Sequence, residues 1–161
     1  MIANHGQSKR YYHDVVGCNS RLDSIQAAIL NIKLKELDNY IAARQNAANF
    51  YNNAFAGHLK IKIPHIAHYS THVYHQYTIV LNNVDRDGLN TYLAEKKIPS
   101  MIYYPVPGHK QKMFSAFGLD NYNLKVTDWL TERVISLPMH TELDEEQLSC
   151  IAKEVLNYIN K

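Results

Sequence analysis

The feature that most constrains this chain is a long stretch between Gly17 and Gly57 that contains neither proline nor glycine. Apolar residues recur through it at the spacing of one helix face; they are Leu22, Ile25, Ile29, Ile32, Leu37, Ile41, Ala48, Tyr51 and Phe55. Asn19 or Ser20 can cap the start of such a helix, and Gly57 can end it because glycine readily adopts positive φ. The pattern predicts one helix over about residues 20–56, roughly 55 Å long at 1.5 Å per residue. Because that length exceeds the diameter of a small domain, we expect part of the helix to pack against another domain, a second chain, or both.

Length, charge and cysteine content place the chain in a broad class without identifying a function. Its 161 residues are enough for one domain with a sizeable core. A formal net charge of +2 is too balanced to indicate a nucleic-acid partner. Cys18 and Cys150 lie far apart, which indicates a reducing compartment without a disulfide framework. The chain shows neither an apolar stretch long enough to span a bilayer nor a signal peptide, so we expect a cytoplasmic protein without a membrane partner.

The first residues resemble the end of an element that began earlier. Residues 2–5 could end a helix at Gly6, although almost no helix precedes them. The polar, aromatic-rich residues 7–14 have no period and are predicted to form a loop. We expect residues 1–19 to be the tail of a missing large domain with a connecting loop, and residues 20–161 to form a C-terminal small domain. A disordered leader is the alternative for the tail.

After Gly57 the pattern changes to short strands and helices in turn. Alternating and β-branched residues predict strands over residues 58–64, 73–81 and 100–104. Helices are predicted over residues 85–97, 111–117 and 126–136, and again after Asp144, which has the capping-box spacing to Gln147. This order indicates an α/β chain of the α+β kind, in which a long leading helix is followed by a small, mostly antiparallel sheet covered by helices.

A stiff connection follows the third predicted strand. Residues 105–109 contain two prolines, which fix φ and lack a backbone donor, so they can form neither a helix nor a central strand. We expect a rigid loop that holds Tyr103, Tyr104 and His109 in a set arrangement.

Four closely spaced histidines, His65, His68, His72 and His75, could in principle coordinate zinc or nickel. They lie across a strand start, where successive side chains point to opposite faces, so His72 and His75 would diverge. No thiol or nearby carboxylate completes a site of the usual kind. We therefore expect no metal, with a histidine-rich metal-binding module as the minor alternative.

The segment from Gly17 to Arg21 is the best candidate site that the residues alone indicate. At a helix start the backbone N–H groups are unpaired and favour an anion. Asn19 can donate an amide hydrogen, and Arg21 can offer a bidentate fork to a phosphate. The alternative is an Asn or Ser cap followed by an arginine that faces solvent. No nucleophile arrangement and no glycine-rich phosphate loop is present, so no catalytic residue is assigned.

Several short motifs occur together in one order along the chain. They are Asn4-His5-Gly6; Gly17-x-Asn19-x-Arg21-Leu22-Asp23-x-Ile25-Gln26-Ala27-Ala28; His75-Gln76-Tyr77; Tyr104-Pro105-Val106-Pro107-x-His109; and Ser136-Leu137-Pro138-Met139-His140. This series resembles the C-terminal part of the DegT/DnrJ/EryC1/StrS family, which are pyridoxal-phosphate sugar aminotransferases of the aspartate-aminotransferase fold type. The resemblance extends over essentially the whole chain and implies the small C-terminal domain of that fold.

The resemblance also implies roles for individual residues. Asn19 would reach across a dimer interface to the phosphate of a cofactor bound mainly by the neighbouring subunit, with Arg21 in support. Tyr104 and His109 match the segment near the sugar-nucleotide site, and Tyr12 lies in a loop that approaches it. Gly108 departs from the family pattern, which usually has a larger apolar residue before the histidine.

The family's Schiff-base lysine, the acid on the pyridine nitrogen and the aromatic that stacks on the ring all belong upstream of this chain, and no lysine here matches that motif. For the parent protein, the resemblance implies a homodimer that moves an amino group, from glutamate, onto a keto-sugar nucleotide. The chain alone is expected to be inactive and not to retain pyridoxal phosphate. The alternative is a stand-alone, non-catalytic binding or oligomerisation module of the same fold.

Overall fold

The computed structural model describes residues 1–118 and 122–161. The chain forms two compact units, Met1–Asn39 and Tyr40–Lys161.

The N-terminal unit begins with a small hairpin. Strands β1 (Gln7–Lys9) and β2 (Tyr12–His13) pair antiparallel, with an irregular register. The expectation of a loop in this region is wrong. Tyr11 turns the chain with a φ of 69°, a conformation that bulky residues rarely adopt. Because the usual turn residues are absent from this position, the sequence did not predict the hairpin.

The long helical stretch is divided into two helices. Helix α1 covers Ser24–Leu34, with Asp23 as its N-cap, and α2 covers Leu37–Phe55. The prediction of one continuous helix from residue 20 is therefore wrong. At the break, the amide nitrogens of Lys35 and Glu36 bond to carbonyl oxygens three residues back, so the α-helical ladder is interrupted by a turn.

The predicted end of the stretch is correct. Helix α2 ends at Phe55, and Gly57 follows with a φ of 72°.

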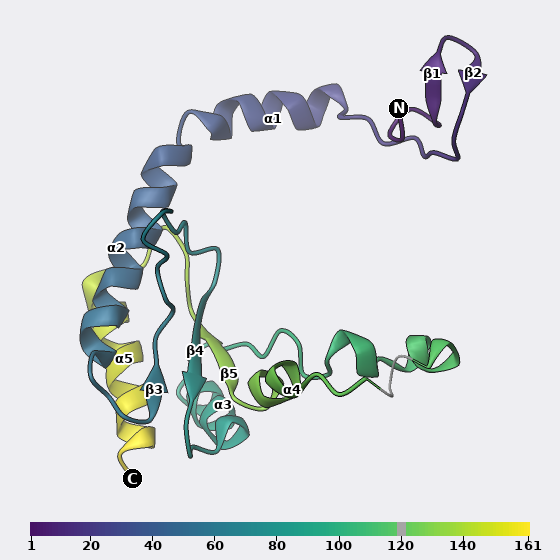
Figure 1. Cartoon of the computed structure of the whole chain (residues 1–161). Helices are drawn as coiled ribbons and strands as arrows, with labels where there is room; N and C mark the ends of the chain where they lie inside the picture. Colours follow the sequence, from purple (N-terminus) through teal and green to yellow (C-terminus); the bar gives the residue numbers. More distant parts are fainter. Residues whose placement is uncertain (119–121) are drawn as a thin grey trace. The chain divides into compact units, whose positions relative to one another are not determined.

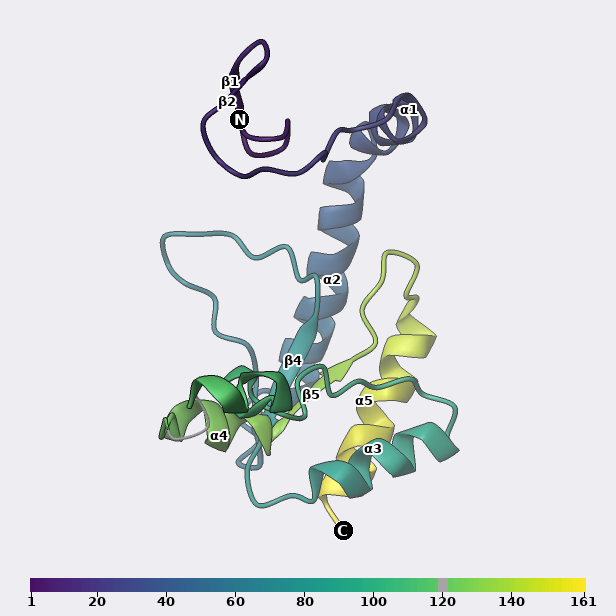
Figure 2. The same ribbon diagram turned by 90° about the vertical axis from the view of Figure 1, so that its right-hand side faces the viewer.

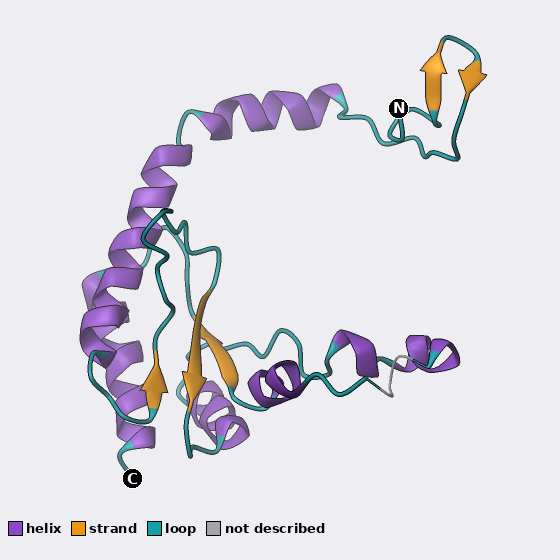
Figure 3. Cartoon of the chain, in the orientation of Figure 1, coloured by secondary structure: helices purple, strands orange, loops and turns teal. Residues whose placement is uncertain are grey.

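The sheet of the second unit has three antiparallel strands in the order β3-β4-β5 (Figure 3). They are β3 (Ile61–Lys62), β4 (Tyr77–Leu81) and β5 (Val134–Leu137). Tyr77 pairs with Leu137, and Ile61 pairs with Leu81. The first two predicted strands are confirmed in shortened form.

Two predictions near this sheet are wrong. The expected strand over residues 100–104 is reduced to a single bridge between Met101 and Ser136. The expected helix over residues 126–136 is instead helix α4 (Lys125–Thr131) followed by strand β5. Apolar residues such as Val134 and Ile135 fit either period over so short a run, and pairing with β4 decides in favour of the strand.

The other helices lie where the sequence placed them, with small shifts of their ends. Helix α3 covers Arg86–Glu95, and α5 covers Glu145–Ile159. The capping box of α5 is confirmed, because Asp144 accepts from the Gln147 amide nitrogen and the Gln147 side chain accepts from that of Asp144. Short 3₁₀ helices η1 (Gly108–Lys110) and η2 (Lys112–Phe117) precede α4. The expectation that residues 105–109 form no helix is wrong for Gly108 and His109, because both lie in η1, after Pro107.

The core of the second unit lies between the sheet and its helices. Helices α2 and α5 lie on one side of the sheet, and the segment with η1, η2 and α4 leads away from its other side (Figures 1 and 2). The largest fully buried side chains are Tyr51, Tyr77, Phe55, Ile79, Leu81, Leu89, Leu93, Ile135, Ile159 and Val155. Tyr51 and Phe55 stack with ring centroids 6.0 Å apart. The predicted architecture of helices around a small antiparallel sheet is thus confirmed.

Among the described residues, no helix combines the length and apolarity that crossing a membrane requires.

Candidate functional site

Two glycines bring the first motif together in the N-terminal unit. A Cβ on Gly6 would lie 1.7 Å from the Val15 carbonyl oxygen, and a Cβ on Gly17 would lie 2.1 Å from the Gly6 nitrogen. Only glycine therefore permits this approach of the two backbone segments. As a consequence, Asn4 and Asn19 form an isolated antiparallel bridge.

The two predicted cofactor-binding residues lie beside this bridge. Arg21 Nη2 donates to Asn4 Oδ1 at 2.7 Å, and Asn4 Nδ2 donates to Gln7 Oε1 at 2.8 Å. Asn19 and Arg21 are both exposed. The structure therefore joins the residues of the two N-terminal motifs in one polar cluster.

The cluster is not a helix N-terminus. Helix α1 begins at Ser24, and the carboxylate of its N-cap, Asp23, accepts from the Gln26 amide nitrogen at 2.8 Å. Residues 17–21 precede the helix, so the expectation that they form its start is wrong. An anion at this place would be held by side chains rather than by the first turn of the helix.

Tyr12 lies in the same unit, on strand β2. Its side chain is exposed, and Lys9 Nζ lies 5.4 Å from the centre of its ring. Tyr104 and His109 belong to the second unit.

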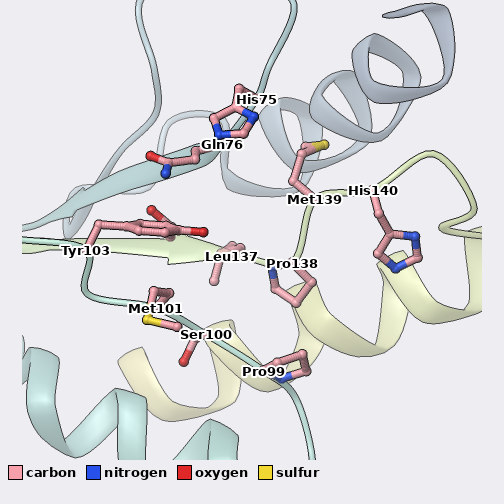
Figure 4. Close-up of a pocket in the computed structure, with 11 residues that line it drawn as sticks. His75, Gln76, Pro99, Ser100, Met101, Tyr103, Leu137, Pro138, Met139 and His140 are labelled. Carbon is pink, nitrogen blue, oxygen red and sulfur yellow. The ribbon is translucent and has the colours of Figure 1, made fainter. Parts of the chain in front are cut away.

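A cavity of about 280 Å³ lies in the second unit, where β4 begins and β5 ends (Figure 4). Its lining residues are His75, Gln76, Pro99, Ser100, Met101, Tyr103, Ser136, Leu137, Pro138, Met139 and His140. In Figure 4, His75 and Gln76 lie opposite Pro99 and Ser100, and the chain from Leu137 to His140 runs along the side. Two motif segments about sixty residues apart in sequence thus meet at one cavity. None of its described lining residues is a lysine, arginine, aspartate or glutamate.

Helix α2 holds the two chain segments that line this cavity. Arg44 Nη1 lies 3.2 Å from the carbonyl oxygens of Tyr74 and His75 and 3.3 Å from that of Met139. This nitrogen carries two protons, so three acceptors share them. Tyr51 adds a hydrogen bond from its hydroxyl to the Pro138 carbonyl oxygen, at 3.1 Å. The cavity walls are therefore tied to a common scaffold.

The remaining predicted substrate residues differ from each other in their surroundings. Tyr104 is exposed. The side chain of His109 is only 9% exposed, and its Nε2 lies 3.6 Å from Asp128 Oδ1 on α4. Lys110 Nζ lies 2.8 Å from the same carboxylate oxygen. His109 is thus turned toward α4 and not toward solvent.

The histidine run does not form a cluster. Within residues 1–118 and 122–161, no three or more His, Cys, Asp and Glu side chains come together in a group that could hold a metal ion. His72 instead accepts from the Tyr74 amide nitrogen through Nδ1 at 2.9 Å, and its ring centroid lies 4.2 Å from that of Tyr74, with the planes tilted by 32°.

Sequence reasoning missed Arg44 and Asp128. Arg44 reads as one more polar residue on a helix, and its acceptors lie 30, 31 and 95 positions away. Asp128 reads as an ordinary acid on an amphipathic helix. No local pattern marks either residue.

Comparisons with known proteins agree with the motifs. Residues 1–156 match the DegT/DnrJ/EryC1/StrS aminotransferase family. The chain is 44% identical over 151 residues to the UDP-N-acetyl-3-dehydro-alpha-D-glucosamine 3-aminotransferase of Acidithiobacillus ferrooxidans, covering 94% of this chain and 40% of that protein. It is 38% identical over 157 residues to the UDP-2-acetamido-2-deoxy-3-oxo-D-glucuronate aminotransferase of Pseudomonas aeruginosa, covering 98% and 42%.

Solved structures agree over the same extent. DesV from Streptomyces venezuelae, in complex with a ketimine intermediate, matches with a TM-score of 0.85 at 29% identity, over 100% of this chain and 43% of that one. A DegT/DnrJ/EryC1/StrS aminotransferase from Brucella abortus matches with a TM-score of 0.83 at 33% identity, over 99% and 42%. The chain spans about two fifths of the length of these relatives, in agreement with a C-terminal part. The expected fold is confirmed, and the chain belongs to the DegT/DnrJ/EryC1/StrS aminotransferase family.

Proposed function

We propose that this chain is the C-terminal part of an aminotransferase that uses pyridoxal phosphate to move an amino group, from glutamate, to a keto-sugar nucleotide. The observation that carries the proposal is the family match over residues 1–156. Several relatives are named for amino transfer on nucleotide-linked sugars, which supports the substrate class. Because the chain spans about two fifths of those relatives, the proposal assigns the complete reaction to a longer protein and inactivity to the isolated chain.

Asn19 and Arg21 are proposed to contact the cofactor phosphate. They fit such a group, since both side chains are exposed in one polar cluster and Arg21 uses one of its five N–H donors on Asn4. A guanidinium with open donors binds a phosphate through paired, charge-assisted hydrogen bonds. When bound, pyridoxal phosphate supplies the electron-accepting ring that transamination needs. The two residues bind and orient its phosphate.

The proposed partner is a second copy of the protein. By family resemblance, Asn19 contacts a cofactor that the neighbouring subunit mainly binds, so a homodimer is needed to complete the site. The uncovered apolar face of α1 supports an assembly, and it equally supports the alternative function of a non-catalytic oligomerisation module.

Tyr12, Tyr104 and His109 are proposed to belong to the sugar-nucleotide site. The cavity beside Tyr103 adds support, because two family motifs meet there. Its lining carries hydroxyl, amide and imidazole groups but no lysine, arginine or carboxylate among the described residues. Such a lining suits an uncharged ring of the substrate better than its diphosphate.

Incubation with pyridoxal phosphate tests whether the chain alone is inactive. We expect weak binding, because phosphate contacts position a cofactor but form no covalent bond with it. After borohydride reduction, peptide mapping should find adducts spread over surface lysines. Stoichiometric labelling of one lysine, together with glutamate-dependent formation of pyridoxamine phosphate, would contradict the proposal.

A chimera tests the function of the parent. The matching segment of the Acidithiobacillus relative is replaced by this chain, and amino transfer from glutamate to that enzyme's keto sugar is measured. We expect activity, and we expect Asn19→Ala and Arg21→Ala to raise the dissociation constant of the cofactor by about tenfold each. Ser20→Ala, at an exposed neighbouring position, is the matched control. A folded but inactive chimera would favour the oligomerisation module.

A further inference from the structure

Asp128 on α4 contacts His109 and Lys110, two consecutive residues at the end of the segment from residue 101 to residue 110, which contains Pro105 and Pro107. Its Oδ1 lies 3.6 Å from His109 Nε2 and 2.8 Å from Lys110 Nζ. Both Asp128 Oδ1 and His109 Nε2 are buried, and among the described residues neither atom makes a hydrogen bond. At 3.6 Å the His109 and Asp128 atoms face each other within ion-pair range but beyond hydrogen-bond distance, and Lys110 supplies the closer contact of the carboxylate.

The segment is fixed at its other end as well. Met101 and Ser136 exchange both backbone hydrogen bonds, at 2.9 and 3.0 Å. Both anchors belong to one short stretch of chain, since helix α4 carries Asp128 and strand β5 carries Ser136. Helix α4 is itself held at its end, where Arg86 donates to the Thr131 carbonyl oxygen. Both ends of the segment from residue 101 to residue 110 are therefore held by the stretch of chain that contains α4 and β5.

The two prolines make the segment stiff, so the contact of His109 with Asp128 affects where Tyr103 and Tyr104 lie. Pro105 and Pro107 fix φ, and Pro107 is extended at φ −61° and ψ 148° before η1 begins. A displacement of His109 from α4 would therefore also move Tyr104, because no flexible linker separates the two residues. Tyr103, at the near end of the segment, lines the cavity.

We infer that Asp128 is a positioning residue: it fastens His109 and Lys110 to α4 and so sets the placement of Tyr103 and Tyr104. In this arrangement His109 contributes to the sugar-nucleotide site by fixing the loop. The anchoring stands on the geometry alone, whereas its consequence for substrate binding rests on the proposed function.

Imidazole nitrogen spectroscopy on the full chain tests the anchor directly. At mildly alkaline pH, long-range ¹H–¹⁵N correlation spectra should show the His109 proton on Nε2, facing the carboxylate. The Nε2–H population should fall in Asp128→Asn, which keeps an acceptor without charge, and fall further in Asp128→Ala. The other eight histidines serve as an internal control for folding. A His109 tautomer that Asp128→Ala leaves unchanged would overturn the inference.

Amide hydrogen exchange gives a second, independent reading. The Lys110 and Gln111 amides bond to the carbonyl oxygens of Pro107 and Gly108, so they report on the integrity of η1. Their exchange should be about fivefold faster in Asp128→Ala. Glu132→Gln removes a carboxylate just after α4 that pairs with Arg133 instead, and it should leave these amides unchanged.

The active chimera separates the anchor from the function. Asp128→Ala should raise KM for the sugar nucleotide about five- to tenfold while kcat changes less than about twofold, because only placement of the binding loop is lost. An altered tautomer with unchanged KM would overturn the role in substrate binding and keep the anchor. An inactive unsubstituted chimera would count against the proposed function alone.

Discussion

Arg44 places one guanidinium nitrogen against three main-chain carbonyl groups, and so joins the segments on both sides of the cavity to helix α2. The side chain is partly buried, and the three oxygens would lose their charged donor if it were removed. Hydrogen bonds to charged groups contribute more to stability than neutral ones, and two of these three contacts are partly buried.

We predict that Arg44→Ala lowers the free energy of unfolding by about 2 kcal/mol, measured by urea denaturation. Arg44→Lys should lose less, because a lysine can still donate to part of the group. Arg133→Ala is the control, since that guanidinium makes exposed contacts and should cost less than about 1 kcal/mol. Equal losses of unfolding free energy in Arg44→Ala and Arg133→Ala would contradict the prediction that the Arg44 hydrogen bonds stabilise the fold.

Two buried tyrosines make the stability of the fold sensitive to alkaline pH. Burial raises the pKa of both Tyr51 and Tyr77 well above the ordinary value of 10.0. Their hydroxyls are hydrogen-bonded, to the Pro138 carbonyl oxygen and to Asn52 Oδ1 respectively. In the unfolded chain both groups ionise near their ordinary pKa, so above it the folded state binds more protons than the unfolded state.

We therefore predict a stability that is fully present below about pH 10 and falls as the pH rises further. Urea midpoints measured from neutral to alkaline pH should show this decline. The double variant Tyr51→Phe and Tyr77→Phe should start from a lower midpoint and decline less steeply. Tyr69→Phe, at a position 82% exposed, should decline as the original chain does. A decline that the double variant leaves unchanged would assign the effect to other groups.

At the scale of elements, α1 carries large apolar side chains although none of its residues is buried. Ile25, Ile29 and Ile32 are 75%, 51% and 69% exposed. An isolated helix of this length is only marginally stable in water, so its apolar face needs a covering surface. The sequence predicted that face correctly from its spacing, whereas what covers it stays a proposal.

We predict that the chain self-associates through this face. Sedimentation velocity over a range of concentrations should show oligomers, and Ile25→Glu with Ile29→Glu should reduce them to monomers. Gln26→Glu with Asn31→Glu adds the same charge at polar positions of the helix and should leave association intact. A chain that stays monomeric at high concentration would contradict the prediction.

At the scale of the whole molecule, the two units differ in what stabilises them. Within Met1–Asn39, which the structure describes completely, Gly6 is the single buried residue. The second unit holds the buried cluster around Tyr51, Tyr77 and Leu89. A unit without buried apolar side chains cannot offset the conformational entropy that folding removes.

We predict that residues 40–161 fold alone and that residues 1–39 do not. The melting temperature of the isolated second unit should lie within about 3 °C of that of the full chain. Circular dichroism of the isolated first unit should show an unfolded peptide. A cooperative melting transition of residues 1–39, or an unfolded second unit, would refute this division of stability.

The sequence by itself determined the features that depend on near neighbours. The capping box of Asp144 and Gln147 and the glycine after α2 are each set by residues within a few positions of each other. The family could also be identified from the sequence, because several motifs in a single order are recognisable without knowledge of the packing.

The tertiary structure decided what depends on distant partners. Strand β5 exists because β4, more than fifty residues earlier, offers a free edge, and its own apolar run suits a helix equally well. The break between α1 and α2, the positive φ of Tyr11, the three acceptors of Arg44 and the approach of Asp128 to His109 carry no local signal. Near-neighbour hydrogen bonding and periodicity can be read along a chain, whereas long-range pairing is settled only when the elements compete for the same surfaces in the folded state.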